Sequence, residues 1–153
     1  PPLVEVGGSY QLKQLEKAFL EYKKYALSTD HDLEVLRRVM LKIPNVGPKT
    51  ADAYIMYAKA NTLMPPVDIH FIRFSRRLLI GNEGFTVPLK AYCLKYSCEN
   101  CPLNRSCLSI IISKKFGFMS GWIQMVSYLH DRDYCVKKAC NNCSLKDVCY
   151  GLI

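Results

Sequence analysis

Long apolar runs are missing from the 153-residue sequence. No stretch approaches the ~18 consecutive apolar residues that a membrane-spanning helix requires, and no signal-peptide pattern is visible. No segment makes a convincing case for a β-sheet. These absences exclude a helical membrane protein. They predict an all-α fold in an intracellular protein, in the cytoplasm or nucleoid of a prokaryotic cell.

Acidic residues are scarce relative to basic ones. The chain has 13 Asp and Glu residues against 21 Lys and Arg residues, which gives a formal net charge of +8. An excess of this size suits a polyanionic partner, although it also fits a basic surface that only keeps a protein soluble. With 50% hydrophobic and 22% charged residues, the composition is that of a folded protein with one domain or two small helical lobes.

Eight cysteines in an intracellular protein indicate metal ligands rather than disulfides. They form two cassettes, residues 93–107 and 135–149, with the same C-x4-C-x2-C-x5-C spacing. The repeat predicts two copies of one small ligand loop. The first cassette consists of Cys93, Cys98, Cys101 and Cys107, and the second of Cys135, Cys140, Cys143 and Cys149.

Two segments with helical periodicity flank a tight turn at residues 43–49. Apolar residues recur on one face between Leu33 and Ile43, where we expect a helix that Asp30 or Asp32 caps, and a second helix is expected from Thr50 to about Lys59. Such a hairpin can direct the N–H groups of its turn outward. Together with the positive N-terminus of the second helix, these groups would make a phosphate site.

Phosphate contacts of this kind position DNA without reading its sequence. Asparagine is the non-glycine residue that best tolerates a left-handed backbone, so Asn45 can support the turn. We expect phosphate contacts from Asn45, Val46, Gly47, Lys49 and Thr50. On a later helix, expected over about 69–79, Arg73, Arg76 and Arg77 either add such contacts, Arg73 first among them, or only face solvent.

Three further helices are expected, over about 11–26, 108–115 and 122–129. Residues 110–112 taken alone would also fit a short strand, and Gly117 and Gly121 are expected to bracket a break. The first of these helices is amphipathic, with an apolar face expected to point inward. That face comprises Leu12, Leu15, Phe19, Tyr22 and Ala26.

The sequence IPNVGPKTA at 43–51, followed by VDIH at 67–70, resembles the helix-hairpin-helix and catalytic aspartate motifs of the DNA glycosylases related to endonuclease III. The similarity continues through Arg73 and Arg77 to the C-terminal cysteine loop and covers about residues 5–149. The order of these motifs is more specific than any one of them. The resemblance implies a helix-hairpin-helix glycosylase fold, with a partial six-helix barrel lobe over 1–80 and a cluster-binding lobe over 81–153.

Two residues could carry chemistry in such an enzyme. The positive end of a helix disfavours the charged form of Lys49, and a neutral lysine can attack a sugar C1′ and form a Schiff base. Asp68 follows two prolines and a valine, so a stiff backbone holds a carboxylate that can stabilise oxocarbenium charge. The resemblance implies that both are catalytic and that His70 is structural. The simpler alternative is that Lys49 only contacts a phosphate and that Asp68 only caps a helix.

The resemblance implies a base-excision DNA glycosylase with AP lyase activity, which extrudes a damaged nucleotide from duplex DNA. Its default substrate would be an oxidised pyrimidine, with oxidised guanine or mismatched bases next, and an abasic site would also be a ligand. The family carries further helices before the segment that matches residues 7–26. We therefore expect a fragment, one half of a split protein or a lineage that lost this region. The alternative function is a non-catalytic iron–sulfur DNA-binding half, completed by a second chain or an N-terminal segment.

The second cassette resembles the C-terminal [4Fe–4S] loop of the family, with a shorter first gap. A four-cysteine zinc site is the alternative, although such sites usually have two paired C-x2-C knuckles and each cassette has one. The first cassette has no counterpart in the family. Its identical spacing predicts a second [4Fe–4S] cluster, with zinc as the alternative. The expected work of the clusters is structural and DNA-contacting.

Overall fold

The computed structural model describes residues 5, 7–25, 32–80 and 84–150. Helices dominate this part of the chain; it contains no β-strand, only an isolated parallel bridge between Thr86 and Cys107. The prediction of an all-α protein is confirmed. No helix in the described ranges is long and apolar enough to cross a membrane. The α-helices are α1 (Tyr10–Tyr25), α2 (Leu33–Lys42), α3 (Pro48–Ala58), α4 (Ile69–Phe74), α5 (Lys90–Lys95), α6 (Leu108–Phe116) and α7 (Ser120–His130).

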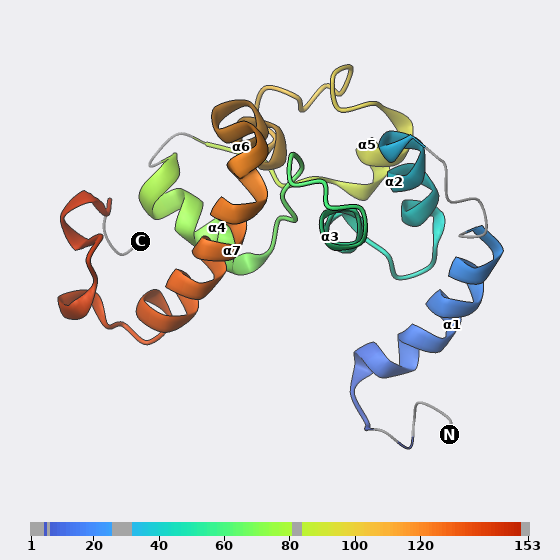
Figure 1. Ribbon diagram of the computed structural model, residues 1–153, viewed down its shortest axis with the longest axis horizontal. Coiled ribbons are helices and arrows are strands. Elements are labelled where there is room, and N and C mark those ends of the chain that lie inside the picture. The colour runs from blue at the N-terminus through green and yellow to red at the C-terminus, as the bar shows by residue number, and fades with distance from the viewer. Residues whose placement is uncertain (1–4, 6, 26–31, 81–83, 151–153) are drawn as a thin grey trace.

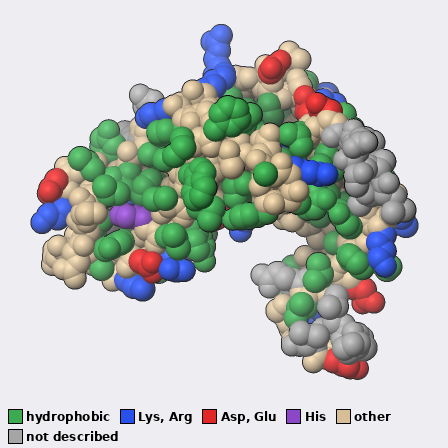
Figure 2. Space-filling view, viewed as in Figure 1, with side chains coloured by type: hydrophobic (Ala, Val, Ile, Leu, Met, Phe, Trp, Pro, Cys, Tyr) green, Lys and Arg blue, Asp and Glu red, His purple; other side chains and the backbone are tan. Residues whose placement is uncertain are grey.

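The helices form an arch, with α1 at one end and the second cysteine cassette at the other (Figure 1). In the space-filling view the arch encloses a broad hollow between α1 and the rest of the molecule (Figure 2). Two apolar clusters stabilise the body of the arch. The first contains Leu36, Met40, Leu41, Ile43, Val46, Ala51 and Ile55, and the second contains Val67, Phe71, Leu108 and Ile112.

The helical hairpin forms as the sequence predicts. Asp32 caps α2, because its carboxylate accepts a hydrogen bond from the N–H of Glu34 at 2.8 Å. Asn45 has a φ of 64°, the left-handed conformation expected for the turn. Helix α3 begins at Pro48, two residues before the predicted start, because the fixed φ of proline suits the first helical position. Asp30, the other candidate cap, lies outside the described residues.

Helix α4 continues into a π-helical turn, Ser75–Leu79, so the predicted helix over 69–79 is present in two parts. Residues 110–112 lie in α6, and the strand alternative is wrong. The break expected between Gly117 and Gly121 is present, because α6 ends at Phe116 and a 3-10 turn, Gly117–Met119, precedes α7. Helix α7 begins at Ser120, so Gly121 lies inside it rather than before it. A Cβ there would lie 2.9 Å from both Met56 Sδ and Thr62 Cβ, so glycine lets α7 approach the loop after α3.

Helix α1 covers the predicted segment but does not bury the predicted face. Leu15 and Phe19 are 49% and 51% exposed. Ala18 and Tyr22 pack against the hairpin cluster, and the Tyr22 hydroxyl lies 3.0 Å from that of Tyr54. Leu15 and Phe19 therefore face the hairpin lobe as expected, where they line an open cavity with Met40 and Ile43, but they are not buried. Ala26 lies outside the described residues.

Candidate functional site

Lys49 lies in the first turn of α3 and is exposed. The N-cap of this helix is Gly47, and no side chain from the part of the chain that the structure describes caps it. The N–H groups of Lys49 and Thr50 therefore have no intrahelical partner and remain available to a ligand. Within the described parts of the chain, the Lys49 side chain forms no hydrogen bond or ion pair. The hairpin thus presents a free amine beside a positive helix end.

The remaining predicted hairpin residues divide by exposure. Asn45 and Thr50 are exposed beside Lys49, and Gly47 is half-buried. Val46 is buried in the hairpin cluster, so only its backbone could serve a phosphate. The first turn of α3 and the left-handed residue Asn45 therefore lie on one short surface segment.

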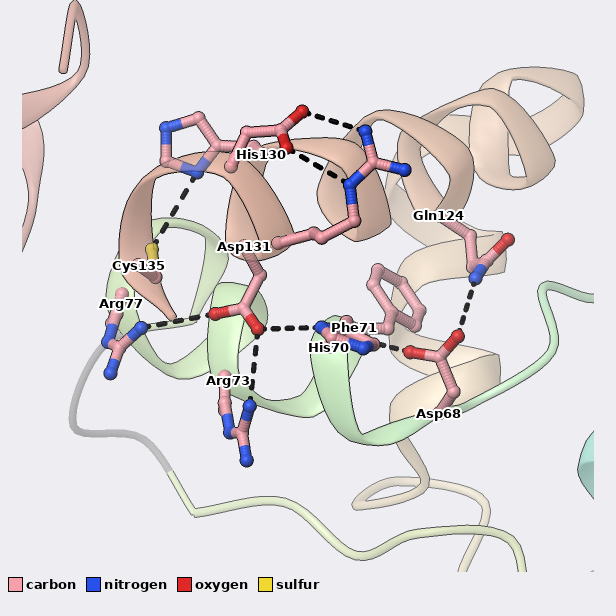
Figure 3. A network of polar contacts seen from close by, with 11 residues as sticks. Asp68, His70, Phe71, Arg73, Arg77, Gln124, His130, Asp131 and Cys135 are labelled. Atoms are coloured by element: carbon pink, nitrogen blue, oxygen red, sulfur yellow. Dashed lines mark hydrogen bonds and ion pairs between the residues drawn. The ribbon is translucent and has the colours of Figure 1, made fainter. Parts of the chain in front are cut away.

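Asp68 is the N-cap of α4, and each carboxylate oxygen has its own donor (Figure 3). Oδ1 accepts a hydrogen bond from the Phe71 N–H at 2.8 Å, and Oδ2 accepts one from Gln124 Nε2 on α7 at 3.2 Å. The preceding Pro65 and Pro66 are buried. These contacts fix the plane of the carboxylate, and each oxygen still has a lone pair for a further partner. Capping and a chemical role are therefore compatible.

Lys49 and Asp68 occupy the N-terminal ends of two consecutive helices, α3 and α4. No hydrogen bond or ion pair joins their side chains in the described ranges. The N-terminus of α4, with Asp68, is fixed to α7, whereas the N-terminus of α3, with Lys49, is part of the hairpin. A substrate that engages both groups would have to span these two elements.

Asp131, fully buried at the end of α7, binds three side chains of the α4 segment (Figure 3). Its Oδ2 lies 2.9 Å from His70 Nδ1 and 3.5 Å from Arg73 Nη1, and its Oδ1 accepts a hydrogen bond from Arg77 Nη1 at 3.2 Å. The role of His70 in the structure is therefore to join α4 to α7. Arg73 is 43% exposed and keeps its other nitrogens for a ligand, whereas Arg77 is largely enclosed.

The four cysteines of the second cassette line a single cavity of about 220 Å³. Arg77 and Lys146 line it too, so two cations face four thiols. The ring of His130 lies between two of the sulfurs, with Nε2 3.2 Å from Cys143 Sγ and Nδ1 3.8 Å from Cys135 Sγ. Burial raises the pKa of Cys135, and the neighbouring Arg77 acts against that rise. Burial also lowers the pKa of His130, which favours the neutral ring.

The cysteines of the first cassette line a second, tighter cavity of about 20 Å³, beside the guanidinium of Arg37. Arg37 is buried and forms two hydrogen bonds with the fully buried Asp52, at 2.5 and 3.0 Å. Burial opposes the charge on Arg37, but the Asp52 carboxylate outweighs it and holds the pKa of Arg37 above its usual range. Burial raises the pKa of Cys98 to about 11 and raises that of Cys107 as well.

None of the eight cysteines forms a disulfide. Among the described residues, no three His, Cys, Asp or Glu side chains are arranged to hold a metal ion. Each cavity is nevertheless lined by four thiols, the number of sulfur ligands that either a tetrahedral zinc ion or a [4Fe–4S] cluster requires.

Sequence reasoning missed the buried charges. Arg37 and Asp52 lie on the buried faces of α2 and α3, and Asp131 continues the buried face of α7. A charged residue on an otherwise apolar stripe is a signal that the sequence contains, because such residues are buried only when they are paired. The spacing of Arg37 with Leu36 and Met40 could have revealed it. The donation from Gln124 to Asp68 has no such signal.

Comparisons with known protein families, with curated proteins and with solved structures find no match for this chain.

Proposed function

We propose that the chain is a base-excision DNA glycosylase with AP lyase activity that acts on duplex DNA. The observation that carries the proposal is the pairing of a free, exposed lysine with an uncapped helix N-terminus on one hairpin. A carboxylate held by two donors at the start of the next helix supports it. The motifs that resemble endonuclease III relatives supply the reaction class.

In the proposed reaction the Nζ of Lys49 attacks C1′ of an extruded nucleotide as the bond from C1′ to the base breaks. The base leaves with its bonding electrons and takes up a proton. Loss of an amine proton and opening of the sugar ring give an imine. Removal of a C2′ proton then expels the 3′ phosphate and cleaves the strand. The imine is finally hydrolysed by water, which restores the lysine.

Asp68 is placed to act on the charge that develops during base loss. As the base departs, positive charge builds on the sugar, and a preorganised carboxylate stabilises it without having to reorganise. The same group can accept the proton that Lys49 loses on attack. Because Phe71 and Gln124 fix the orientation of the carboxylate, the negative charge is in place before the substrate arrives.

The hairpin and Arg73 account for the proposed DNA contacts. The free N–H groups of Lys49 and Thr50 and the positive end of α3 would hold one backbone phosphate. Arg73 is half-exposed, and its ion pair with Asp131 is long at 3.5 Å, so it can reach a second phosphate. Such contacts fix register on the duplex and make binding salt-dependent.

The second cassette would hold a [4Fe–4S] cluster, as its resemblance to the family's cysteine loop implies. Its four thiols line one cavity, and Arg77 and Lys146, which line the same cavity, would offset the charge of an anionic cluster. When bound, the cluster supplies cross-links that hold the C-terminal loop. The chain's own Lys137 and Lys138 are exposed on that loop and would face DNA.

One observation favours a second candidate function, a non-catalytic DNA-binding half of a larger assembly. The apolar face of α1 is half-exposed and lines a cavity of about 460 Å³ together with Met40, Ile43 and Val46 of the hairpin lobe. A large apolar surface of this kind is typical of a face that another element covers. In that arrangement the hairpin would dock DNA, and the chemistry would need the other part of the assembly.

A cleavage assay on a duplex with one oxidised pyrimidine separates the two functions. The metal-loaded chain is expected to cleave the damaged strand without alkali and to leave an unsaturated aldehyde at the 3′ end. Cleavage that appears only after alkali would show a glycosylase without lyase activity. Binding of the damaged duplex with no base release would contradict the enzyme and support the docking module.

A further inference from the structure

The first cysteine cavity is in contact with both the helical hairpin and the segment that leads to Asp68. It is lined by Arg37 of α2, by Met64 of the loop before α4, and by four cysteines that lie in α5, in the loop after it and at the N-cap of α6. The segment of the second cassette, by contrast, lies at the end of the arch opposite α1 (Figure 1). The two cassettes share the same cysteine spacing, but the first contacts several helices in the body of the arch and the second lies at its end.

On the hairpin side, two basic residues join the first cassette to the turn. Lys90, at the start of α5, donates hydrogen bonds to the carbonyl of Val46 at 2.7 Å and to that of Ile43 at 3.4 Å. Arg37 lies beside the Cys93 thiol and is itself held by Asp52 of α3. Helix α5 thereby supports the turn carbonyls, and the ion pair joins the cavity to both hairpin helices.

On the Asp68 side, the last cysteine begins α6, which packs under the segment before α4. The Ser109 hydroxyl donates a hydrogen bond to the carbonyl of Pro65 at 2.9 Å, and both residues are buried. Leu108, fully buried, packs with Val67 and Phe71 in the second apolar cluster. The two residues that follow Cys107 therefore connect it to the segment before Asp68, one through a hydrogen bond and the other through apolar packing.

The loop that carries the two middle cysteines is also organised from within. Asn104 donates hydrogen bonds to the carbonyls of Cys98, at 2.7 Å, and Glu99, at 3.2 Å, and accepts one from Lys114 at 2.9 Å. Thr86 pairs with the chain on either side of Cys107, through an N–H donated to Ser106 and a carbonyl that accepts from Leu108. The four thiols are thus presented by a fixed loop rather than by a chance approach of cysteines.

We propose that the first cassette holds a second [4Fe–4S] cluster and that this cluster fixes the helical hairpin relative to the Asp68 segment. The four thiols line one cavity and repeat the spacing of the second cassette, and the Arg37–Asp52 ion pair fixes a guanidinium beside them. The importance assigned to Lys49 and Asp68 rests on the function proposed above. The metal site and the mechanical coupling do not depend on it.

Metal content tests the site itself. The chain, reconstituted anaerobically with iron and sulfide, is expected to bind about eight irons, and Cys101→Ser and Cys143→Ser about four each. These two cysteines hold the same position in their cassettes, so each variant is the control for the other. One zinc with about four irons, or an iron content that Cys101→Ser leaves unchanged, would overturn the second cluster.

Hydrogen exchange at residues 43–51 tests the coupling. Cys101→Ser is expected to accelerate exchange of the hairpin amides at least several-fold, whereas Cys143→Ser leaves them unchanged. Lys90→Met, which spares every thiol, is expected to accelerate the same amides with the full iron content retained. Lys95→Met, on the exposed end of α5, is its matched control.

Exchange that is equal in the two cysteine variants, or unaffected by Lys90→Met, would contradict the coupling. Neither iron content nor exchange measures catalysis. A chain with two clusters and a coupled hairpin but no lyase activity would therefore retain this inference while the proposed function fails. An active chain with one cluster would do the reverse.

Discussion

Asp68→Asn is expected to lower the rate of base excision on the order of 10²–10³-fold. The substitution removes the negative charge that would stabilise the positive charge on the sugar as the base departs. The fold should be retained. Asparagine caps a helix about as well as aspartate, and its Oδ1 can still accept the hydrogen bond from Phe71. Single-turnover excision of an oxidised pyrimidine measures the loss. Duplex binding should change little, since Asp68 is not among the proposed phosphate contacts.

Gln124→Met provides the control for this variant. It removes the hydrogen bond to Oδ2 but keeps the carboxylate charge, so we expect a loss of less than about tenfold. A preformed abasic site offers a second comparison, because its base has already left. Lyase activity on that site should suffer less from Asp68→Asn than base excision does. Equal losses for Asp68→Asn and Gln124→Met would contradict a role for the charge.

Asp131→Asn is expected to reduce the free energy of unfolding by about 3–5 kcal/mol, the range found when one partner of a buried ion pair is removed. Asp131 is fully buried, and its carboxylate binds His70, Arg73 and Arg77. An amide would leave the largely enclosed guanidinium of Arg77 without its counter-charge. It would also offer a single acceptor oxygen to the three donors that the carboxylate now binds. Urea denaturation of the metal-loaded variant, kept anaerobic, measures the change.

Asp133→Asn is the matched control for the buried carboxylate, two residues further along the chain. Asp133 also pairs with two cations, Arg132 and Lys137, and its hydrogen bond from Arg132 lowers its pKa to about 2. Water screens these exposed pairs, so the urea midpoint should scarcely move. Similar midpoints for the two variants would contradict the view that the Asp131 network joins α4 to α7.

The parts of the fold that follow local rules could be predicted from the sequence. Periodicity gave every α-helix except α5, and Asn45 adopts the left-handed turn that its side chain permits. Local rules could not place Gly121, because its role is set by Met56 and Thr62, more than fifty residues away in the chain. The exposure of the apolar face of α1 could not be predicted for a similar reason: amphipathicity predicts a buried face but not the surface that buries it.

The candidate site was predictable as a set of residues but not as a network. Motif order indicated Lys49, Asp68 and His70, and spacing indicated the two cassettes. The partners of these residues come from distant elements, as Gln124 does for Asp68 and Arg37 for the first cassette. Buried charges such as Arg37 and Asp131 could have been flagged from their apolar stripes, whereas their pairing depends on how the helices pack.

Borohydride trapping on a duplex with one abasic site tests the central claim most directly, because only a Schiff base is captured covalently. The metal-loaded chain is expected to form a stable adduct, and Lys49→Gln is expected to form none. Lys42→Gln, which removes an exposed lysine from the end of α2, should trap as the unaltered chain does. An unaltered chain that binds the duplex but never traps, or an adduct that persists in Lys49→Gln, would contradict a lyase acting through Lys49.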